Sequence, residues 1–131
     1  MKQKKTTEDY LKTIYILKLQ KKSHGADIAR ALGVSRPTVS TALKALEQEG
    51  YVWMHKSRIV HLTDHGLRIA RDTYERHQTF QELLICLGVD QKTAAHDACE
   101  MEHSVSSQSF YAFKAALEEM KGKAKYESAL D

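Results

Sequence analysis

Residues 25–62 carry the pattern that most constrains how this 131-residue chain can fold. Apolar side chains recur at helical spacing in two stretches, residues 28–32 and residues 39–46, and Gly33 lies between them. A glycine suits this position because a tight turn between two helices needs a residue in the left-handed backbone conformation. The pattern therefore predicts a helix-turn-helix, although an ordinary pair of packed helices with a glycine turn would share it.

The second predicted helix has the surface of a helix that lies in the major groove of DNA. Ser35 is expected to cap it, and Pro37 fits its first turn, where a missing backbone N–H costs nothing. Its outward-facing side chains are short, polar or basic, which suits contact with base edges and phosphates. The predicted DNA contacts from this helix are Ser35, Arg36, Pro37, Thr38, Ser40, Thr41 and Lys44.

Two segments rich in β-forming residues follow, at residues 51–55 and 59–62, and they flank the basic sequence Lys56-Ser57-Arg58. This arrangement predicts a β-hairpin with a basic tip, the wing of a winged helix. Lys56 and Arg58 are expected to contact phosphates beside the recognition helix. Because the wing and the helix-turn-helix occur together, double-stranded DNA is the preferred partner for this half of the chain.

The two halves of the chain carry opposite charge. Residues 1–75 contain 14 lysines and arginines against 8 acidic residues, whereas residues 76–131 contain 6 against 9. The basic half holds the predicted DNA reader, so the acidic half is expected to have another task. Two cysteines are too few for a disulfide framework, and the sequence has no apolar signal or membrane-spanning run. We therefore expect a cytoplasmic protein with no membrane partner and no organic cofactor.

Three potential metal ligands lie close together in the acidic half. Cys99, Glu102 and His103 stand at positions i, i+3 and i+4, so their side chains are expected on one face of a helix. A thiolate, a carboxylate and an imidazole within one turn suit a borderline divalent metal ion. A structural interpretation stays open as well, because a buried cysteine is usually an inert apolar residue and a neighbouring glutamate and histidine usually lie at the surface.

Two alternative functions belong to other classes. The segment from Cys99 to His103 is a distorted His-x-x-Glu-His motif, which raises a zinc hydrolase. Its first ligand is wrong and no substrate pocket is indicated, so an enzyme is not expected. The other alternative is a metal-independent winged-helix regulator that senses oxidants through Cys99.

Four segments carry a more specific signal, and they follow one another in the order Thr6–Tyr15, Ile28-Ala29 with Pro37–Ser40, Glu75–His77 and Cys99–Ser104. Together they resemble the iron- and manganese-dependent repressors, the family of the diphtheria toxin repressor and the manganese transport regulator. The resemblance implies that Asp9 binds the primary metal ion together with Cys99, Glu102 and His103. It also implies that His77 serves a second metal site. From its position alone, Asp9 could instead complete a capping box with Thr6.

The chain departs from both branches of this family. Lys12 stands where the manganese-type repressors have a glutamate, and Gln81 and Ala95 replace the glutamate and histidine of the iron-type ancillary site. We expect one full metal site per chain, because a cation at position 12 repels a second divalent ion. Cys99 resembles the iron-type ligand, and a thiolate favours Fe²⁺, Co²⁺, Ni²⁺ or Zn²⁺ over Mn²⁺. The expected cofactor is Fe²⁺ or Mn²⁺, with Co²⁺, Ni²⁺ or Zn²⁺ as substitutes in vitro.

The expected fold is mainly α. A winged helix-turn-helix with a two-stranded wing is expected at residues 1–63, and an all-helical metal-binding and dimerisation domain at residues 64–131. The apolar stripe from Phe110 to Met120 either packs inside the protomer or forms the face of a homodimer that reads a palindromic operator. The further predicted helices run from Thr6 or Thr7 to Gln20, from Thr63 to Gly88, from Asp90 to about His103, and through Phe110 to about Gly122, with Lys123–Asp131 as a frayed tail. Together these features predict a metal-activated repressor of metal-homeostasis genes.

Overall fold

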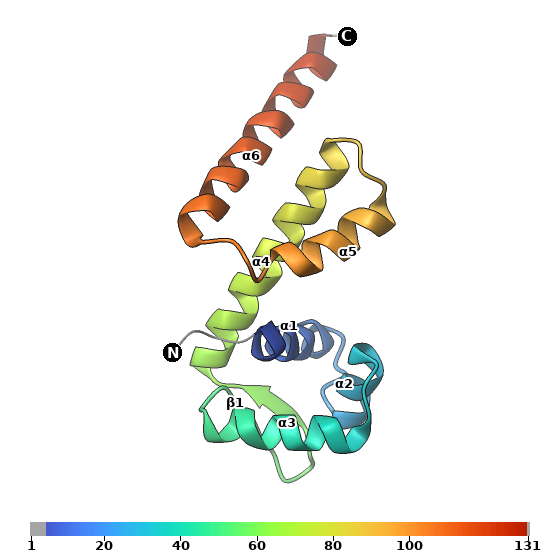
Figure 1. The fold of residues 1–131 in the computed structure, drawn as a ribbon, viewed down its shortest axis with the longest axis vertical. Coiled ribbons are helices and arrows are strands. Elements are labelled where there is room, and N and C mark those ends of the chain that lie inside the picture. Colours follow the sequence, from blue (N-terminus) through green and yellow to red (C-terminus); the bar gives the residue numbers. More distant parts are fainter. Residues whose placement is uncertain (1–4, 131) are drawn as a thin grey trace. The chain divides into compact units, whose positions relative to one another are not determined.

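The computed structural model describes residues 5–130, which form six helices and one two-stranded antiparallel sheet (Figure 1). The elements are α1 (Lys5–Leu19), α2 (Gly25–Leu32), α3 (Arg36–Gln48), β1 (Val52–Met54), β2 (Val60–Leu62), α4 (Asp64–Cys86), α5 (Gln91–Met101) and α6 (Ser107–Leu130). The predicted mainly α class is therefore confirmed. None of the described helices is both long enough and apolar enough to cross a membrane.

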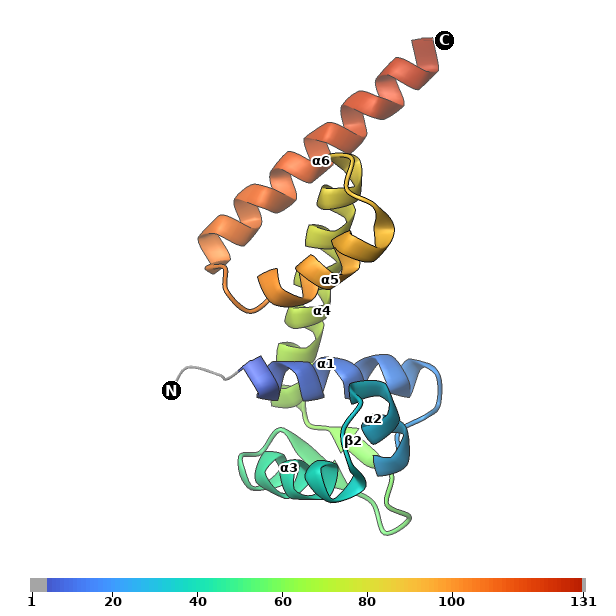
Figure 2. The ribbon, with the colours of Figure 1, turned by 45° about the vertical axis from the view of Figure 1, so that its right-hand side comes forward.

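The chain divides into two compact units, and the division falls inside α4, between Thr73 and Tyr74. The domain boundary expected at residues 63 and 64 stays a prediction. In the first unit, α1 and α3 run along opposite sides, and α2 and the hairpin join them (Figures 1 and 2). Every one of these elements contributes to its apolar core, which consists of Tyr10, Leu11, Ile14, Leu17, Ile28, Ala29, Val39, Leu43, Leu46, Val52, Val60 and Ala70.

The helix-turn-helix has the local structure that its sequence predicts. Gly33 adopts the left-handed conformation, with φ 69°, and its N–H donates to the Ala29 carbonyl to end α2. Ser35 caps α3, because its hydroxyl accepts a hydrogen bond from the Thr38 N–H at 3.2 Å. Pro37 lies in the first turn of the helix. Short-range backbone chemistry therefore ends α2 at Gly33 and begins α3 after Ser35.

The predicted wing is present, with strands one or two residues shorter than the β-rich segments. Trp53 pairs with His61 at the centre of the ladder. The His55 N–H donates to the Ile59 carbonyl at 2.9 Å, and Arg58 at the tip has a left-handed φ of 66°. A further bridge joins Ile59 to His24, just before α2. The hairpin is thus tied to the helix-turn-helix as well as to itself.

The second unit contains most of α4, together with α5 and α6, around a small aromatic core. Phe80 and Phe110 meet edge to face with ring centroids 5.9 Å apart, and Ala98 is buried with them. Asp90 caps α5 as predicted, since its carboxylate accepts a hydrogen bond from the Thr93 N–H at 3.0 Å. This bond and that from the Thr93 hydroxyl lower the pKa of Asp90.

Two predicted helix ends in this unit are wrong. The helix expected to reach His103 ends at Met101, so Glu102 is its C-cap and His103 lies beyond it. The last helix does not stop near Gly122 but runs to Leu130, and Asp131 lies outside the described residues. One glycine costs a helix only about 1 kcal/mol, and the lysines and alanines that follow it are strong helix formers. The frayed tail is therefore absent over residues 123–130.

Candidate DNA-binding and metal sites

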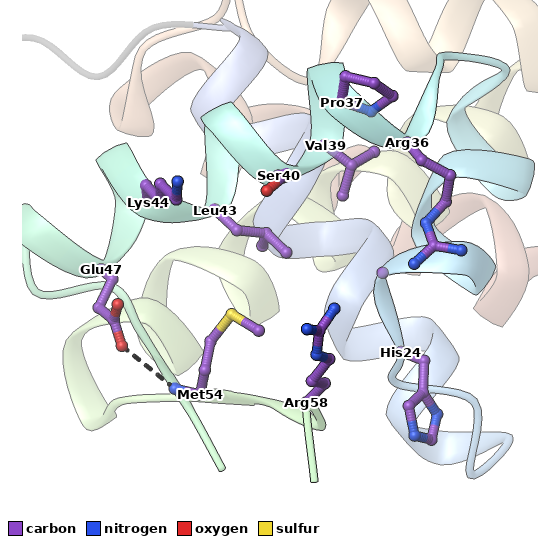
Figure 3. A pocket seen from close by; sticks show the side chains of 11 residues that line it. His24, Arg36, Pro37, Val39, Ser40, Leu43, Lys44, Glu47, Met54 and Arg58 are labelled. Carbon is purple, nitrogen blue, oxygen red and sulfur yellow. Dashed lines mark hydrogen bonds between the residues drawn. The ribbon is translucent and has the colours of Figure 1, made fainter. Parts of the chain in front are cut away.

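An open groove of about 610 Å³ lies between α3 and the hairpin in the first unit (Figure 3). Five of the predicted DNA contacts line it, four from α3 and one from the hairpin tip: Arg36, Pro37, Ser40, Lys44 and Arg58. In Figure 3 the Arg58 side chain points from the hairpin toward α3. Two elements distant in sequence thus place guanidinium and ammonium groups around one groove, which suits an anionic polymer such as DNA.

The other predicted contacts lie near this groove without lining it. Ser35 and Thr38 share a 2.8 Å hydrogen bond between their hydroxyls at the start of α3. Thr41 and Lys56 are exposed, the latter at the hairpin tip. All nine predicted residues therefore belong to α3, its cap or the hairpin tip, as expected.

Sequence reasoning did not assign two residues with titratable side chains that line the groove, Glu47 and His24. Glu47 lies on α3 three residues after Lys44, and its carboxylate accepts a hydrogen bond from the Met54 N–H at 3.3 Å (Figure 3). Helical spacing alone could have placed Glu47 on this face. His24 reaches the groove only because its backbone bridges to Ile59 in the hairpin, and no sequence signal indicates that pairing.

The opposite side of the hairpin is aromatic. Trp53 stacks on His61 with centroids 4.2 Å apart, and His55 meets the same His61 ring edge-on at 6.4 Å. The pKa of His61 is lowered chiefly because its ring is partly desolvated. The positive charge of Lys18 and the nearby His55 lower it further. The fixed positive charge of the hairpin comes from Lys56 and Arg58 at its tip, and Arg58 lines the groove.

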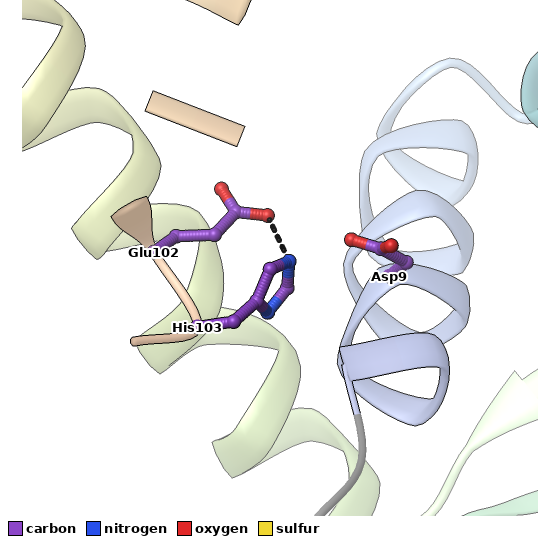
Figure 4. Close-up of side chains that lie close together, drawn as sticks. All are labelled: Asp9, Glu102 and His103. Atoms are coloured by element: carbon purple, nitrogen blue, oxygen red, sulfur yellow. Dashed lines mark ion pairs between the residues drawn. The ribbon is translucent and has the colours of Figure 1, made fainter. Parts of the chain in front are cut away.

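Four potential metal ligands converge within the second unit. His77, from α4, has its Nδ1 atom 3.7 Å from the Cys99 Sγ atom and 3.0 Å from Glu102 Oε2. The other carboxylate oxygen, Glu102 Oε1, lies 3.1 Å from His103 Nε2 (Figure 4). The Glu102 side chain is fully buried, and those of His103 and His77 are 6% and 16% exposed. A carboxylate held between two imidazoles beside a thiol is a donor set that suits a borderline divalent ion.

The geometry of this cluster differs from the expected face of one helix. Only Cys99 lies inside α5, whereas Glu102 is its cap. The three residues still lie close together because Glu102 keeps a helical φ of −60° and its N–H still bonds to the Ala98 carbonyl. The resemblance assigns His77 to a second metal site. In the structure, however, His77 contacts Cys99 and Glu102, which the resemblance assigns to the primary site. The fifth predicted ligand, Asp9, belongs to α1 in the first unit (Figure 4).

Comparison with known proteins covers nearly the whole chain. Residues 3–60 match the N-terminal DNA-binding domain of the iron-dependent repressors, and residues 63–125 match their metal-binding and dimerisation domain. The transcriptional regulator MntR of Salmonella typhimurium is 39% identical over 109 residues, which cover 82% of this chain and 69% of that protein. An uncharacterised helix-turn-helix regulator of Methanocaldococcus jannaschii is 30% identical over 88% of this chain and 95% of its own length.

Solved structures show the same fold. A manganese-dependent transcriptional repressor in complex with manganese superposes with a TM-score of 0.78 and 31% sequence identity. The match covers 86% of this chain and 52% of that one, so this chain spans about half the length of the repressor it matches.

Proposed function

This chain belongs to the iron-dependent repressor family, and we propose that it represses genes of metal-ion homeostasis when it binds a divalent metal ion. The observation that carries the proposal is the cluster of His77, Cys99, Glu102 and His103 around the buried Glu102 carboxylate, with the exposed Cys99 at its edge. The oxidant-sensing alternative is not favoured, because the similar proteins include manganese-dependent repressors. A hydrolase is not favoured either, because the relatives described above are transcriptional regulators. A repressor acts on DNA, so we also propose a cytoplasmic location.

The proposed DNA-binding form is a homodimer on a palindromic operator. One part of the α6 stripe packs inside the protomer, since Phe110 and Leu117 are buried. Phe113 also meets the Phe80 ring, with centroids 5.6 Å apart, but it stays 39% exposed, and Tyr111 on the same helix is 62% exposed. Exposed aromatic side chains on the helix of a matched dimerisation domain support a contact with a second copy.

The proposed metal ligands are the four clustered residues together with Asp9. A bound divalent ion would supply positive charge that offsets the carboxylates of Asp9 and Glu102. Asp9 would then hold α1, and with it the first unit, to the second unit. Restricting the two units in this way favours the spacing of recognition helices that fits an operator. By linkage, operator DNA should raise the affinity for metal by the same factor.

We propose that each chain binds one ion tightly. Lys12 is buried on α1, three residues after Asp9, where the family resemblance implies a glutamate in the manganese-type repressors. A lysine there opposes a second divalent ion and offers it no carboxylate. Gln81 on α4 and Ala95 on α5 likewise supply no charge to an ancillary site.

The decisive experiment measures operator binding by purified apoprotein across a series of divalent ions at one salt concentration, because phosphate contacts make affinity depend on salt. Calorimetry on the same samples counts the bound ions. We expect DNA binding that requires metal, with one tight ion per chain. Full operator binding by the apoprotein would overturn the proposal, and two tight ions per chain would overturn its single site.

The wing can be tested with Arg58→Ala. Loss of one phosphate contact is expected to weaken binding to all DNA sequences and to reduce the slope of log K against log salt by about 0.9. Fluorescence anisotropy at several salt concentrations gives this slope. Arg71→Ala is the matched control, since Arg71 is also an exposed arginine of the first unit but does not line the groove. An unchanged slope in Arg58→Ala would exclude the proposed contact.

The thiol of Cys99 should decide which metal is preferred. Cys99→Glu replaces a soft ligand by a hard carboxylate, so activation is expected to shift toward Mn²⁺ and away from Co²⁺ and Zn²⁺. The thiolate charge-transfer absorption of the Co²⁺ complex should disappear as well. Cys86→Glu is the control, because Cys86 is an exposed cysteine at the end of α4. A Cys99→Glu protein with unchanged metal preference would contradict a thiolate ligand.

A further inference from the structure

We propose that Arg76 is a positioning residue of the metal centre, which holds the connection between α5 and α6 against α4. This connection, residues 102–106, carries Glu102 and His103. The proposal rests on the metal-binding function proposed above and extends it to a residue outside the ligand set.

The Arg76 guanidinium bonds to the far end of the connection. Arg76 is 8% exposed, and its Nη1 atom donates to the Val105 carbonyl. Its Nη2 atom donates to the hydroxyl of Ser107, the first residue of α6, at 3.3 Å. A planar guanidinium can serve two acceptors at once, which a lysine ammonium on a flexible stem does less well. Arg76 therefore fixes the point at which the connection enters α6.

The guanidinium is itself held in place by the aromatic core. Its Cζ atom lies 4.9 Å from the centroid of the Phe110 ring, and Phe110 is 1% exposed against Phe80. A buried charge is costly unless its hydrogen bonds are satisfied, so moving Val105 or Ser107 away from Arg76 has a large penalty. The connection is accordingly restrained through both hydrogen bonds and packing.

Arg76 and His77 meet the connection from adjacent positions on α4. Successive side chains of an α-helix point about 100° apart. His77 contacts Glu102 at the start of the connection, and Cys99 in the last turn of α5 before it, while Arg76 bonds to Val105 near the other end. With both ends anchored to one rigid helix, the distance from the His77 ring to Glu102 is restrained before any ion binds. This is the preorganisation that a tight metal site needs.

The test uses the full chain with Arg76→Lys and Arg76→Met, and Lys114→Met as the matched control. Lys114 on α6 binds Glu75 on α4 at 2.7 Å, so its loss removes another tie between the same two helices but leaves residues 102–107 untouched. Two quantities are measured: amide hydrogen exchange of the apoprotein at Ser104 and Ser109, both hydrogen-bonded in this region, and calorimetric Co²⁺ affinity.

Arg76→Lys is expected to speed exchange at both amides and to weaken Co²⁺ binding about tenfold, the scale of losses outside the ligand shell. Arg76→Met should do so more strongly, and Lys114→Met should match the wild type in both measurements. If Arg76→Met does not fold, Arg76→Lys decides the matter alone. Wild-type exchange and affinity in Arg76→Lys would overturn this inference but not the proposed function. A wild-type protein that binds no Co²⁺ would overturn both.

Discussion

Glu102→Gln is expected to abolish metal-dependent operator binding while the protein remains folded. The substitution keeps the size of the side chain but removes the carboxylate that lies 3.0 Å from the His77 ring and 3.1 Å from the His103 ring. A neutral amide in this place cannot balance a divalent ion, so we expect metal affinity to fall by at least about 100-fold. Calorimetry measures the metal affinity, and fluorescence anisotropy with operator DNA measures its consequence.

Glu100→Gln serves as the matched control, because Glu100 is an exposed glutamate near the end of the same helix. It is expected to bind both metal and operator as the wild type does. Weak, metal-independent DNA binding at low salt should survive in Glu102→Gln, since the groove of the first unit contains none of the clustered ligands. Metal-dependent repression that persists in Glu102→Gln would exclude this cluster as the metal site.

Gly66→Ala is expected to destabilise the first unit strongly, contrary to the usual effect of replacing glycine with alanine inside a helix. A Cβ atom at Gly66 would lie 2.0 Å from the Tyr51 carbonyl oxygen, which is backbone and cannot rotate away. The same oxygen already accepts the Thr63 N–H, and the Thr63 hydroxyl caps α4 through the Gly66 N–H. We expect a loss of about 3 kcal/mol, measured as the free energy of unfolding in urea.

Gly122→Ala provides a control with the opposite expected sign. Gly122 is an exposed glycine inside α6, and a Cβ atom there would meet nothing within 4 Å. Alanine should therefore stabilise the protein by about 0.5–1 kcal/mol through helix propensity alone. Stabilisation by Gly66→Ala as well would show that α4 does not begin against Tyr51 in solution.

The DNA-binding unit was predictable in most of its detail because its signals are local. The left-handed turn at Gly33, the Ser35 cap and the position of Pro37 depend on residues no more than four positions apart. Backbone hydrogen bonds and fixed φ values act over that range in any protein. The strands of the wing were equally clear, while the approach of His24 to the groove depends on a bridge to Ile59, 35 positions away.

The proposed metal site was predictable only in part. Spacing brought Cys99, Glu102 and His103 together, although α5 ends before the last two. The family resemblance, not the spacing, singled out His77, and only the fold shows its ring beside Cys99 and Glu102. Periodicity tells which residues share a face of one helix, but not which face of another helix will meet it.

The amino-acid sequence alone determines the winged helix-turn-helix, the division of charge between the halves and most of the proposed ligand set, because each follows from residue type and short spacing. Tertiary packing decides which residues distant in sequence come into contact. It places Arg76 against Val105, 29 positions away, and it gives Gly66 and Gly122 opposite tolerance for the same added methyl group. The physical reason is that steric exclusion and burial act between atoms close in space, whatever their separation along the chain.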